Sequence, residues 1–270
     1  MLKQRLLTAL VLAPAALAGV FLLPQPWFAV FVAVAMVLGA WEWGRLAGFD
    51  SRRARLLFGA GLGVLLLVCI LVRPWVPVPA LMLVTVLFWL LALYWVVRFP
   101  AAGIWASSLG RLLIGYLVLT SSWFALVELK QLERGNLMIL LLLLLVWAAD
   151  VGAYVAGKTW GRNKLAPAVS PGKTREGLWG GLVSCVLVGV VFGLWLELPL
   201  AQLVYLVVLS LCTGLASVLG DLFESMLKRY QGIKDSGRML PGHGGMLDRI
   251  DSLTAAAPVF VLGMWLMTEL

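Results

Sequence analysis

The amino-acid sequence predicts an all-α, polytopic membrane protein with about nine transmembrane helices. Of its 270 residues, 62% are hydrophobic and only 13% are charged, and the mean hydropathy is +1.00. A soluble domain is about 45–50% apolar and about 25% charged, and a chain of this size cannot remove so much apolar surface from water. The solvent for most of the chain is therefore a bilayer, which excludes soluble globular, fibrous and disordered proteins.

Long apolar runs give the number of elements. A spanning helix needs about 20 mostly apolar residues, and the runs here are continuous rather than alternating as barrel strands are. Proline-containing breaks at 23–26, 73–79 and 198–199 separate neighbouring runs. We treat 1–270 as a single transmembrane domain. The nine runs are 6–23, 27–44, 56–72, 80–97, 112–127, 137–157, 177–196, 200–220 and 253–267.

The first run resembles a signal peptide, because Lys3 and Arg5 precede an apolar, alanine-rich segment. Eight further runs follow it, so an uncleaved first helix is the favoured interpretation.

The basic residues predict the orientation. With nine spans, 18 of the 21 Lys and Arg residues lie at the N-terminus or in the loops that follow even-numbered spans. Only Arg73, Lys130 and Arg134 lie on the other side. The positive-inside rule then places the N-terminus and the long polar segments in the cytoplasm and the C-terminus outside. The net charge of +8 indicates anionic lipids rather than nucleic acid, because no basic run is interleaved with aromatic residues.

The segment 220–252 contains the first group of candidate site residues. If the helix over 200–220 continues, Asp221, Glu224, Ser225 and Lys228 share one face. A carboxylate, a hydroxyl and an ammonium on one face suit a metal-bound phosphate. A solvated interfacial face explains the pattern equally well.

A glycine-rich turn and two aspartates follow in the same segment. Three glycines surround His243, and Asp248 and Asp251 lie at the start of the last span on either side of Arg249. Helix capping explains one of these aspartates but not both. Asp221 and Asp248 can share a divalent cation, and Mg2+ suits them because it needs few carboxylates when substrate phosphates complete its shell.

The segment 150–176 contains residues suited to phosphates. Ser170, Lys173, Thr174 and Arg175 belong to a sequence that resembles the end of a P-loop. That pattern requires glycine at position 167, where Pro167 stands, and we predict no strand before it. We therefore reject a P-loop. Binding of a polyphosphate by these residues remains a hypothesis, beside a purely topogenic role for their charges.

Asp150 lies well inside the sixth apolar run. An intramembrane carboxylate is costly and is by default a functional candidate. The alternative is that the span ends near residue 149 and leaves Asp150 at the interface. Tyr154 and the pair Gly152 and Gly157 indicate a packed, polar-lined helix face rather than lipid contact.

Residues 225–251, SMLKRYQGIKDSGRMLPGHGGMLDRID, resemble the signature of the phosphatidate cytidylyltransferases, also called CDP-diacylglycerol synthases. Residues 150–177, with SPGKTREG, are similar to the family as well. Both stretches lie in the C-terminal half, about 137–270, whereas the N-terminal half resembles the family in hydropathy only. The resemblance implies cytidylyl transfer from CTP to phosphatidic acid, which gives CDP-diacylglycerol and pyrophosphate. It also implies a homodimer in the bacterial inner membrane and Mg2+ as cofactor, with or without a second cation.

The resemblance also implies residue roles. Asp221 and Asp248 are expected to be the metal carboxylates, and Asp251 to orient Arg249 or a metal-bound water. His243 is expected either to shape the glycine-rich turn or to touch a phosphate. The basic residues expected to neutralise phosphates are Lys173, Arg175, Lys228, Lys234 and Arg249, of which Lys228 and Arg249 are expected to be catalytic. The other expected substrate-binding residues are Asp150, Ser170 and Thr174.

Other classes of membrane protein fit the composition. A polyprenol kinase is a close rival, whereas a CDP-alcohol phosphotransferase would carry a DGxxAR-type motif, which is absent. A transporter would place its polar residues near the bilayer midplane. Here they cluster at one predicted face, which favours an enzyme.

Overall fold

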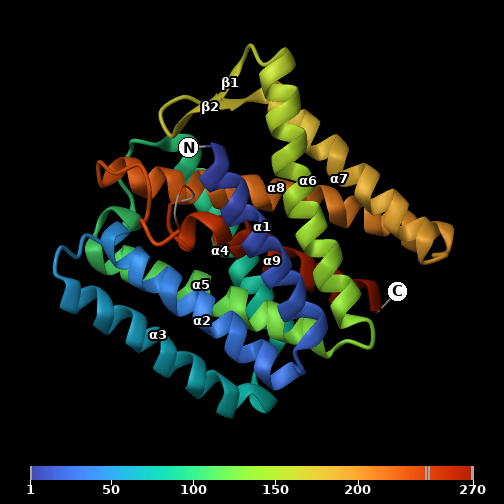
Figure 1. The fold of residues 1–270 in the computed structure, drawn as a ribbon, viewed down its shortest axis with the longest axis horizontal. Coiled ribbons are helices and arrows are strands. Elements are labelled where there is room, and N and C mark those ends of the chain that lie inside the picture. Colours follow the sequence, from blue (N-terminus) through green and yellow to red (C-terminus); the bar gives the residue numbers. More distant parts are fainter. Residues whose placement is uncertain (1, 241, 243, 269–270) are drawn as a thin grey trace.

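A computed structural model describes residues 2–240, 242 and 244–268, and Figure 1 shows the fold as a bundle of helices. It confirms the predicted all-helical class, with nine α-helices and two 3-10 turns in the described part of the chain. The α-helices are α1 (Leu2–Leu22), α2 (Gln25–Leu46), α3 (Arg52–Val72), α4 (Val78–Arg98), α5 (Ser108–Gln131), α6 (Gly135–Trp160), α7 (Arg175–Trp195), α8 (Leu200–Tyr230) and α9 (Leu247–Thr268).

The helices begin where the local sequence supplies a start signal. Pro26 and Pro79 lie in the first turns of α2 and α4, where the missing N–H costs no helical hydrogen bond. The hydroxyl of Ser107 accepts a hydrogen bond from the Gly110 N–H at 3.0 Å and so caps α5.

Eight helices, α2 to α9, are long and apolar enough to cross a membrane, and the described residues 10–22 of α1 form a shorter apolar helix. The chain is a polytopic membrane protein. Two boundaries differ from the prediction. The eighth helix continues ten residues past 220 to Tyr230, and α9 begins at Leu247 instead of 253. The polar residues 221–230 therefore lie on the end of α8, and Asp248 and Asp251 lie on the first turns of α9.

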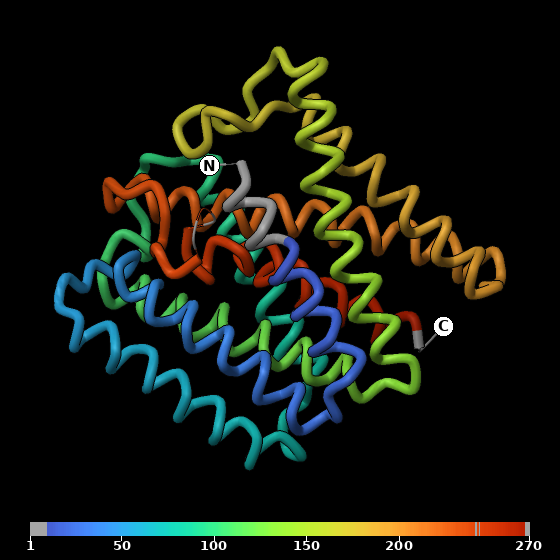
Figure 2. Tube along the Cα trace, viewed as in Figure 1, coloured from blue at the N-terminus to red at the C-terminus, as the bar shows by residue number. Residues whose placement is uncertain are grey.

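The two central helices, α8 and α9, pack against each other and contact both halves of the bundle. The α6–α7 pair lies on one side of them, and α2, α3 and α5 lie on the other, as the trace in Figure 2 shows. The α6–α7 crossing depends on small residues, since a Cβ on Gly180 would lie 2.2 Å from the Cβ of Ala156 and 2.8 Å from the Gly152 oxygen. The packed face predicted around Gly152 is confirmed, although Tyr154 itself is exposed.

A short hairpin joins α6 to α7. Its strands, β1 (Lys164–Ala166) and β2 (Ser170–Thr174), pair in the antiparallel sense. The expectation that no strand precedes the lysine of this segment is wrong. The rejection of a P-loop still holds, because Pro167 occupies the required glycine position and Lys173 belongs to a strand rather than to a phosphate-binding loop.

One end of the bundle is defined by hydrogen bonds between elements distant in sequence. Gln231, just after α8, donates to the Leu46 oxygen at the end of α2 at 3.1 Å. Arg111, near the start of α5, is buried and donates to the Ala47 oxygen at 3.3 Å. The ends of α2 and α8 and the start of α5 thus meet at this end.

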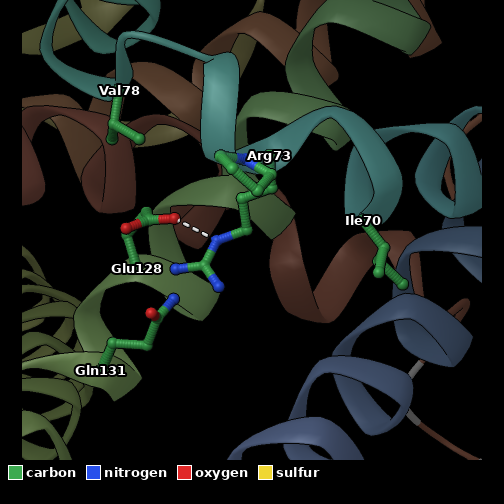
Figure 3. A pocket seen from close by; sticks show the side chains of 6 residues that line it. Ile70, Arg73, Val78, Glu128 and Gln131 are labelled. Atoms are coloured by element: carbon green, nitrogen blue, oxygen red, sulfur yellow. Dashed lines mark hydrogen bonds and ion pairs between the residues drawn. The ribbon is translucent and has the colours of Figure 1, made fainter.

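A cavity of about 350 Å³ lies at the other end, beside the 3-10 turn η1 (Arg73–Trp75). Figure 3 shows its lining, with the Arg73 Nε 2.5 Å from the Glu128 Oε1. The lining contains none of the predicted site residues. The predicted residues of α8 lie instead toward the end of the bundle where α2 and α8 meet.

We expect the Gly180→Val substitution to destabilise the α6–α7 crossing, because the new side chain has no space beside Ala156 and the Gly152 backbone. Overpacking of this kind costs about 1–3 kcal/mol, and thermal unfolding in detergent measures it. Gly63→Ala is the control, since its Cβ would meet only a Val37 methyl at 3.7 Å. Equal midpoints for the two variants would contradict this account of the crossing.

Candidate active site

The backbones of α8 and α9 touch where their acidic residues lie. A Cβ on Gly220 would come within 2.4 Å of the Asp251 carbonyl oxygen and 3.2 Å of the Ala255 Cβ. This close approach brings the polar face of α8 next to the first turns of α9. The continued helix also confirms that Asp221 and Lys228 lie on one helix.

Lys228 is the cation at the centre of this crossing. It is buried, and its Nζ lies 2.8 Å from the Asp248 Oδ1 and 3.2 Å from the Glu224 Oε1. Glu224 is 2% exposed. One ammonium therefore pairs with two carboxylates from different helices, and removing it would leave both without a counter-charge in a poorly solvated site.

Asp248 connects α9 to the segment before it. Its Oδ2 accepts hydrogen bonds from the Gly245 N–H at 2.7 Å, the Ser236 Oγ at 2.9 Å and the Ser236 N–H at 3.1 Å. The residue thus serves as the acidic group in the first turn of α9, where the helix dipole favours it. It also fixes the glycine-rich segment 236–247 onto α8 through Lys228.

A second ion pair joins the hairpin to α8. The Lys173 Nζ, on β2, lies 2.8 Å from the Asp221 Oδ2, and the Asp221 Oδ1 accepts from the Ser225 Oγ at 3.2 Å. Both side chains are partly exposed. The two polar segments of the sequence therefore meet in one site.

A cavity of about 360 Å³ adjoins this ion pair, between α6, α7, α8 and the hairpin. Asp150 and Lys173 supply polar groups to its wall, and Leu165, Leu178 and Val218 supply apolar ones. Asp150 lies within α6, which continues to Trp160. The cavity can accommodate a molecule with both a charged and an apolar part.

The other predicted residues are more scattered. Arg175, Lys234 and Arg249 are exposed, and the described residues contain no ion pair to any of them. The alternative that Asp251 orients Arg249 is therefore not supported. The Asp251 Oδ1 accepts instead from the Ser252 N–H at 2.7 Å.

Three further predicted residues, Ser170, Thr174 and His243, remain to be placed. Ser170 begins β2 and is half-buried. Thr174 is buried, and its hydroxyl caps α7 by accepting from the Gly177 N–H at 3.1 Å. His243 lies outside the described residues.

Two residues that the sequence did not predict, Glu42 and Ser236, lie beside this site. Glu42 lies on α2 and is 1% exposed, and Ser236 is fully buried. A signal for Glu42 was present, because it is an acidic residue between Trp41 and Trp43 inside a predicted span, where ionisable residues are functional candidates. Ser236 carried no comparable signal in the sequence.

The donor atoms of the site fit a hard cation. Carboxylates of Asp221, Glu224, Asp248 and Asp251 come from α8 and α9, and among the described residues only Lys173 and Lys228 form ion pairs with them. Apart from the ion pair with Lys228, the two oxygens of Glu224 have no hydrogen-bond donor within the described structure. Oxygen donors with surplus negative charge suit Mg2+. No three acidic side chains of the described residues already converge as a metal site.

The fold and this site define a polytopic membrane protein in which carboxylates and lysines from distant segments are paired at one site. The profile of the cytidylyltransferase family matches residues 3–267. The phosphatidate cytidylyltransferase of Pseudomonas aeruginosa is 46% identical over 266 residues, which are 98% of this chain and 97% of the relative. That of Haemophilus influenzae is 38% identical over 281 residues, with 96% and 97% coverage. The chain belongs to the cytidylyltransferase family, which confirms the resemblance of residues 225–251.

We expect Lys228→Met to destabilise the protein by about 3–5 kcal/mol, because Glu224 and Asp248 would lose their shared counter-charge. Thermal unfolding in detergent is the measurement, with the exposed Lys164→Met on β1 as the matched control. Adding Glu224→Gln should restore part of the loss, since it removes one uncompensated charge. No recovery in the double variant would show that Lys228 stabilises through packing alone.

Proposed function

We propose that this protein transfers the cytidylyl group of CTP to phosphatidic acid, giving CDP-diacylglycerol and pyrophosphate, at the site where α6, α7, α8 and α9 meet. The observation that carries the proposal is the Lys173–Asp221 ion pair at the wall of an amphipathic cavity. It joins the two polar segments of the chain, and the membership of the family over nearly the whole length supports the assignment.

The reaction needs positioning more than acid–base catalysis. A phosphate oxygen of phosphatidic acid forms a bond to the α-phosphorus of CTP, and the bond between the α- and β-phosphates breaks to release pyrophosphate. The attacking phosphate is already ionised at neutral pH. The site must therefore bring two anions together and neutralise the charge that develops on the pyrophosphate.

The basic residues of the site suit that task in two ways. Lys173 lies at the cavity wall, where its ammonium can leave Asp221 and bind the phosphate of the lipid instead. Arg175, Lys234 and Arg249 are exposed and available to the phosphates of CTP. Lys228 is buried and paired with two carboxylates, so its role is to hold the α8–α9 crossing together.

Mg2+ completes this proposal. Asp221 and Asp248 would hold it, and when bound it would neutralise phosphate charge and polarise the α-phosphorus. The Lys173 ammonium lies 2.8 Å from Asp221 and the Lys228 ammonium lies 2.8 Å from Asp248. Both carboxylates are therefore already paired with a positive charge, which supports a cation beside them. A second cation beside Glu224 or Asp251 would offset the remaining negative charge.

The remaining parts of the proposal concern the membrane. The excess of basic residues at the end that carries the site supports a cytoplasmic active site, a cytoplasmic N-terminus and an outer C-terminus in the bacterial inner membrane. Nucleotides are available on that side. A homodimer is proposed from the family resemblance alone.

Purified protein incubated with α-labelled CTP and phosphatidic acid should give lipid-linked label and pyrophosphate, and chelation of divalent metal should stop the reaction until Mg2+ is restored. Thin-layer separation of the lipid product measures the outcome. A polyprenol kinase is the rival. Transfer of the γ-phosphate to a lipid, with no label transferred from the α-position, would contradict the proposal.

We expect Asp221→Asn and Asp248→Asn each to lower kcat by roughly 100-fold or more, since each removes a charge from the proposed cation site. Asp221→Asn should leave the thermal midpoint nearly unchanged, because this side chain is partly exposed. Asp248→Asn should also lower the midpoint, because it weakens four hydrogen bonds to Ser236, Gly245 and Lys228. Exposed Asp50→Asn is the control. Near-normal turnover in either site variant would refute the shared cation.

A further inference from the structure

We infer that Glu42, on α2 in the N-terminal half, is a positioning residue of the active site. Its carboxylate holds the glycine-rich segment 236–247 and the start of α9, and thereby fixes Asp248 beside Lys228. The consequence for catalysis rests on the proposed function, whereas the consequence for the segment itself does not.

Glu42 caps α9 from another helix. Its Oε2 accepts a hydrogen bond at 2.8 Å from the N–H of Leu247, the first residue of α9 and 205 positions away in the chain. The first N–H groups of a helix have no partner within the helix, and the helix dipole favours a negative charge there. A carboxylate from α2 thus sets where α9 begins.

Ser236 links Glu42 to the proposed cation site. The Ser236 Oγ lies 3.4 Å from the Glu42 Oε2 and 2.9 Å from the Asp248 Oδ2, and the Ser236 N–H donates to Asp248 as well. A continuous set of contacts therefore runs from Glu42 through Ser236 and Asp248 to Lys228. Arg45, one turn further along α2, donates to the Ser236 oxygen at 3.1 Å and holds the same point.

Two glycines of the segment are shaped around the carboxylate. A Cβ on Gly237 would lie 1.9 Å from the Glu42 Oε1, and one on Gly245 would lie 2.2 Å from the Oε2. Neither glycine has a positive φ, so its backbone would accept alanine. The atoms nearest to a Cβ at either position belong to the Glu42 side chain. The two glycines therefore pack directly against this carboxylate.

Stability alone does not account for an acidic residue here. Glu42 is 1% exposed, and its Oε1 accepts no hydrogen bond from the described residues. A buried carboxylate that is only partly satisfied is costly, and a well-packed apolar residue usually serves stability better. What Glu42 supplies is a defined position for residues 236–240 and 244–246, which lie outside the helices and are joined by a bridge between Leu240 and Gly244.

The first test compares Glu42→Ala and Glu42→Gln with Glu133→Ala and Glu133→Gln, which alter an exposed acid of the α5–α6 connection. Hydrogen exchange of residues 236–247 is measured beside kcat and the thermal midpoint in the full-length protein. Glu42→Ala should raise exchange in this segment about tenfold, as expected for a lost cap, and lower kcat by a similar factor. Glu42→Gln keeps an acceptor for the Leu247 N–H and should recover much of the protection. Unchanged exchange in Glu42→Ala would overturn the inference, whatever the cytidylyl-transfer assay gives.

The second test is a double-mutant cycle with Gly237→Ala. In the wild-type background the new methyl group has no space and should raise exchange in the segment and lower kcat. In the Glu42→Ala background the three nearest atoms are gone, so the same change should have little further effect. Equal effects in both backgrounds would show that Gly237 is required for another reason and that the segment does not wrap around Glu42. If no cytidylyl transfer is observed, hydrogen exchange of residues 236–247 is the measurement for the double-mutant cycle.

Discussion

The ion pairs of Lys228 are the interaction on which the active-site end of this protein depends. A single ammonium lies between Glu224 of α8 and Asp248 of α9, about two helical turns along α8 from Gly220, where the helices approach most closely. Charges in a membrane protein are tolerated where they are paired inside the bundle. The pairing therefore fixes the relative position of the two central helices, and every other functional element is attached to one of them. The hairpin is attached through Lys173, and the glycine-rich segment through Asp248 and Ser236.

The same arrangement explains why catalytic groups can lie on helices rather than on loops. A helix that extends beyond the apolar region positions its side chains at fixed intervals, so Asp221, Ser225 and Lys228 are held without a dedicated loop structure. Two lysines pair with carboxylates of this face. Anionic substrates would compete for these ammonium groups, and the freed carboxylates would then favour a cation. Charge balance of this kind couples the binding of phosphates to that of the metal.

Much of the fold could be predicted from the sequence, because hydrophobic length is a strong constraint in a bilayer. The positions and number of the apolar runs agree with the helices. The ends of α8 and α9 were misplaced, since hydropathy marks where apolar residues stop and not where the helical hydrogen bonds stop. The hairpin was not predicted for a related reason. A strand of five residues such as Ser170–Thr174 is too short to show a clear alternation of apolar and polar side chains. Motif resemblance identified most of the charged residues but could not show which of them pair.

Glu42 shows why the rest of the site was not visible in the sequence. Its partners Ser236 and Leu247 are about 200 positions away, and only tertiary packing brings an apolar N-terminal helix against the glycine-rich segment. A resemblance confined to the C-terminal half directs attention to residues that touch substrates. The N-terminal helices then look like a passive support. The contacts of α2 argue otherwise, because Glu42 and Arg45 make hydrogen bonds with Leu247 and Ser236, on either side of the described residues that lead into α9. The apolar half of the chain thus contacts the segment that presents the charged groups.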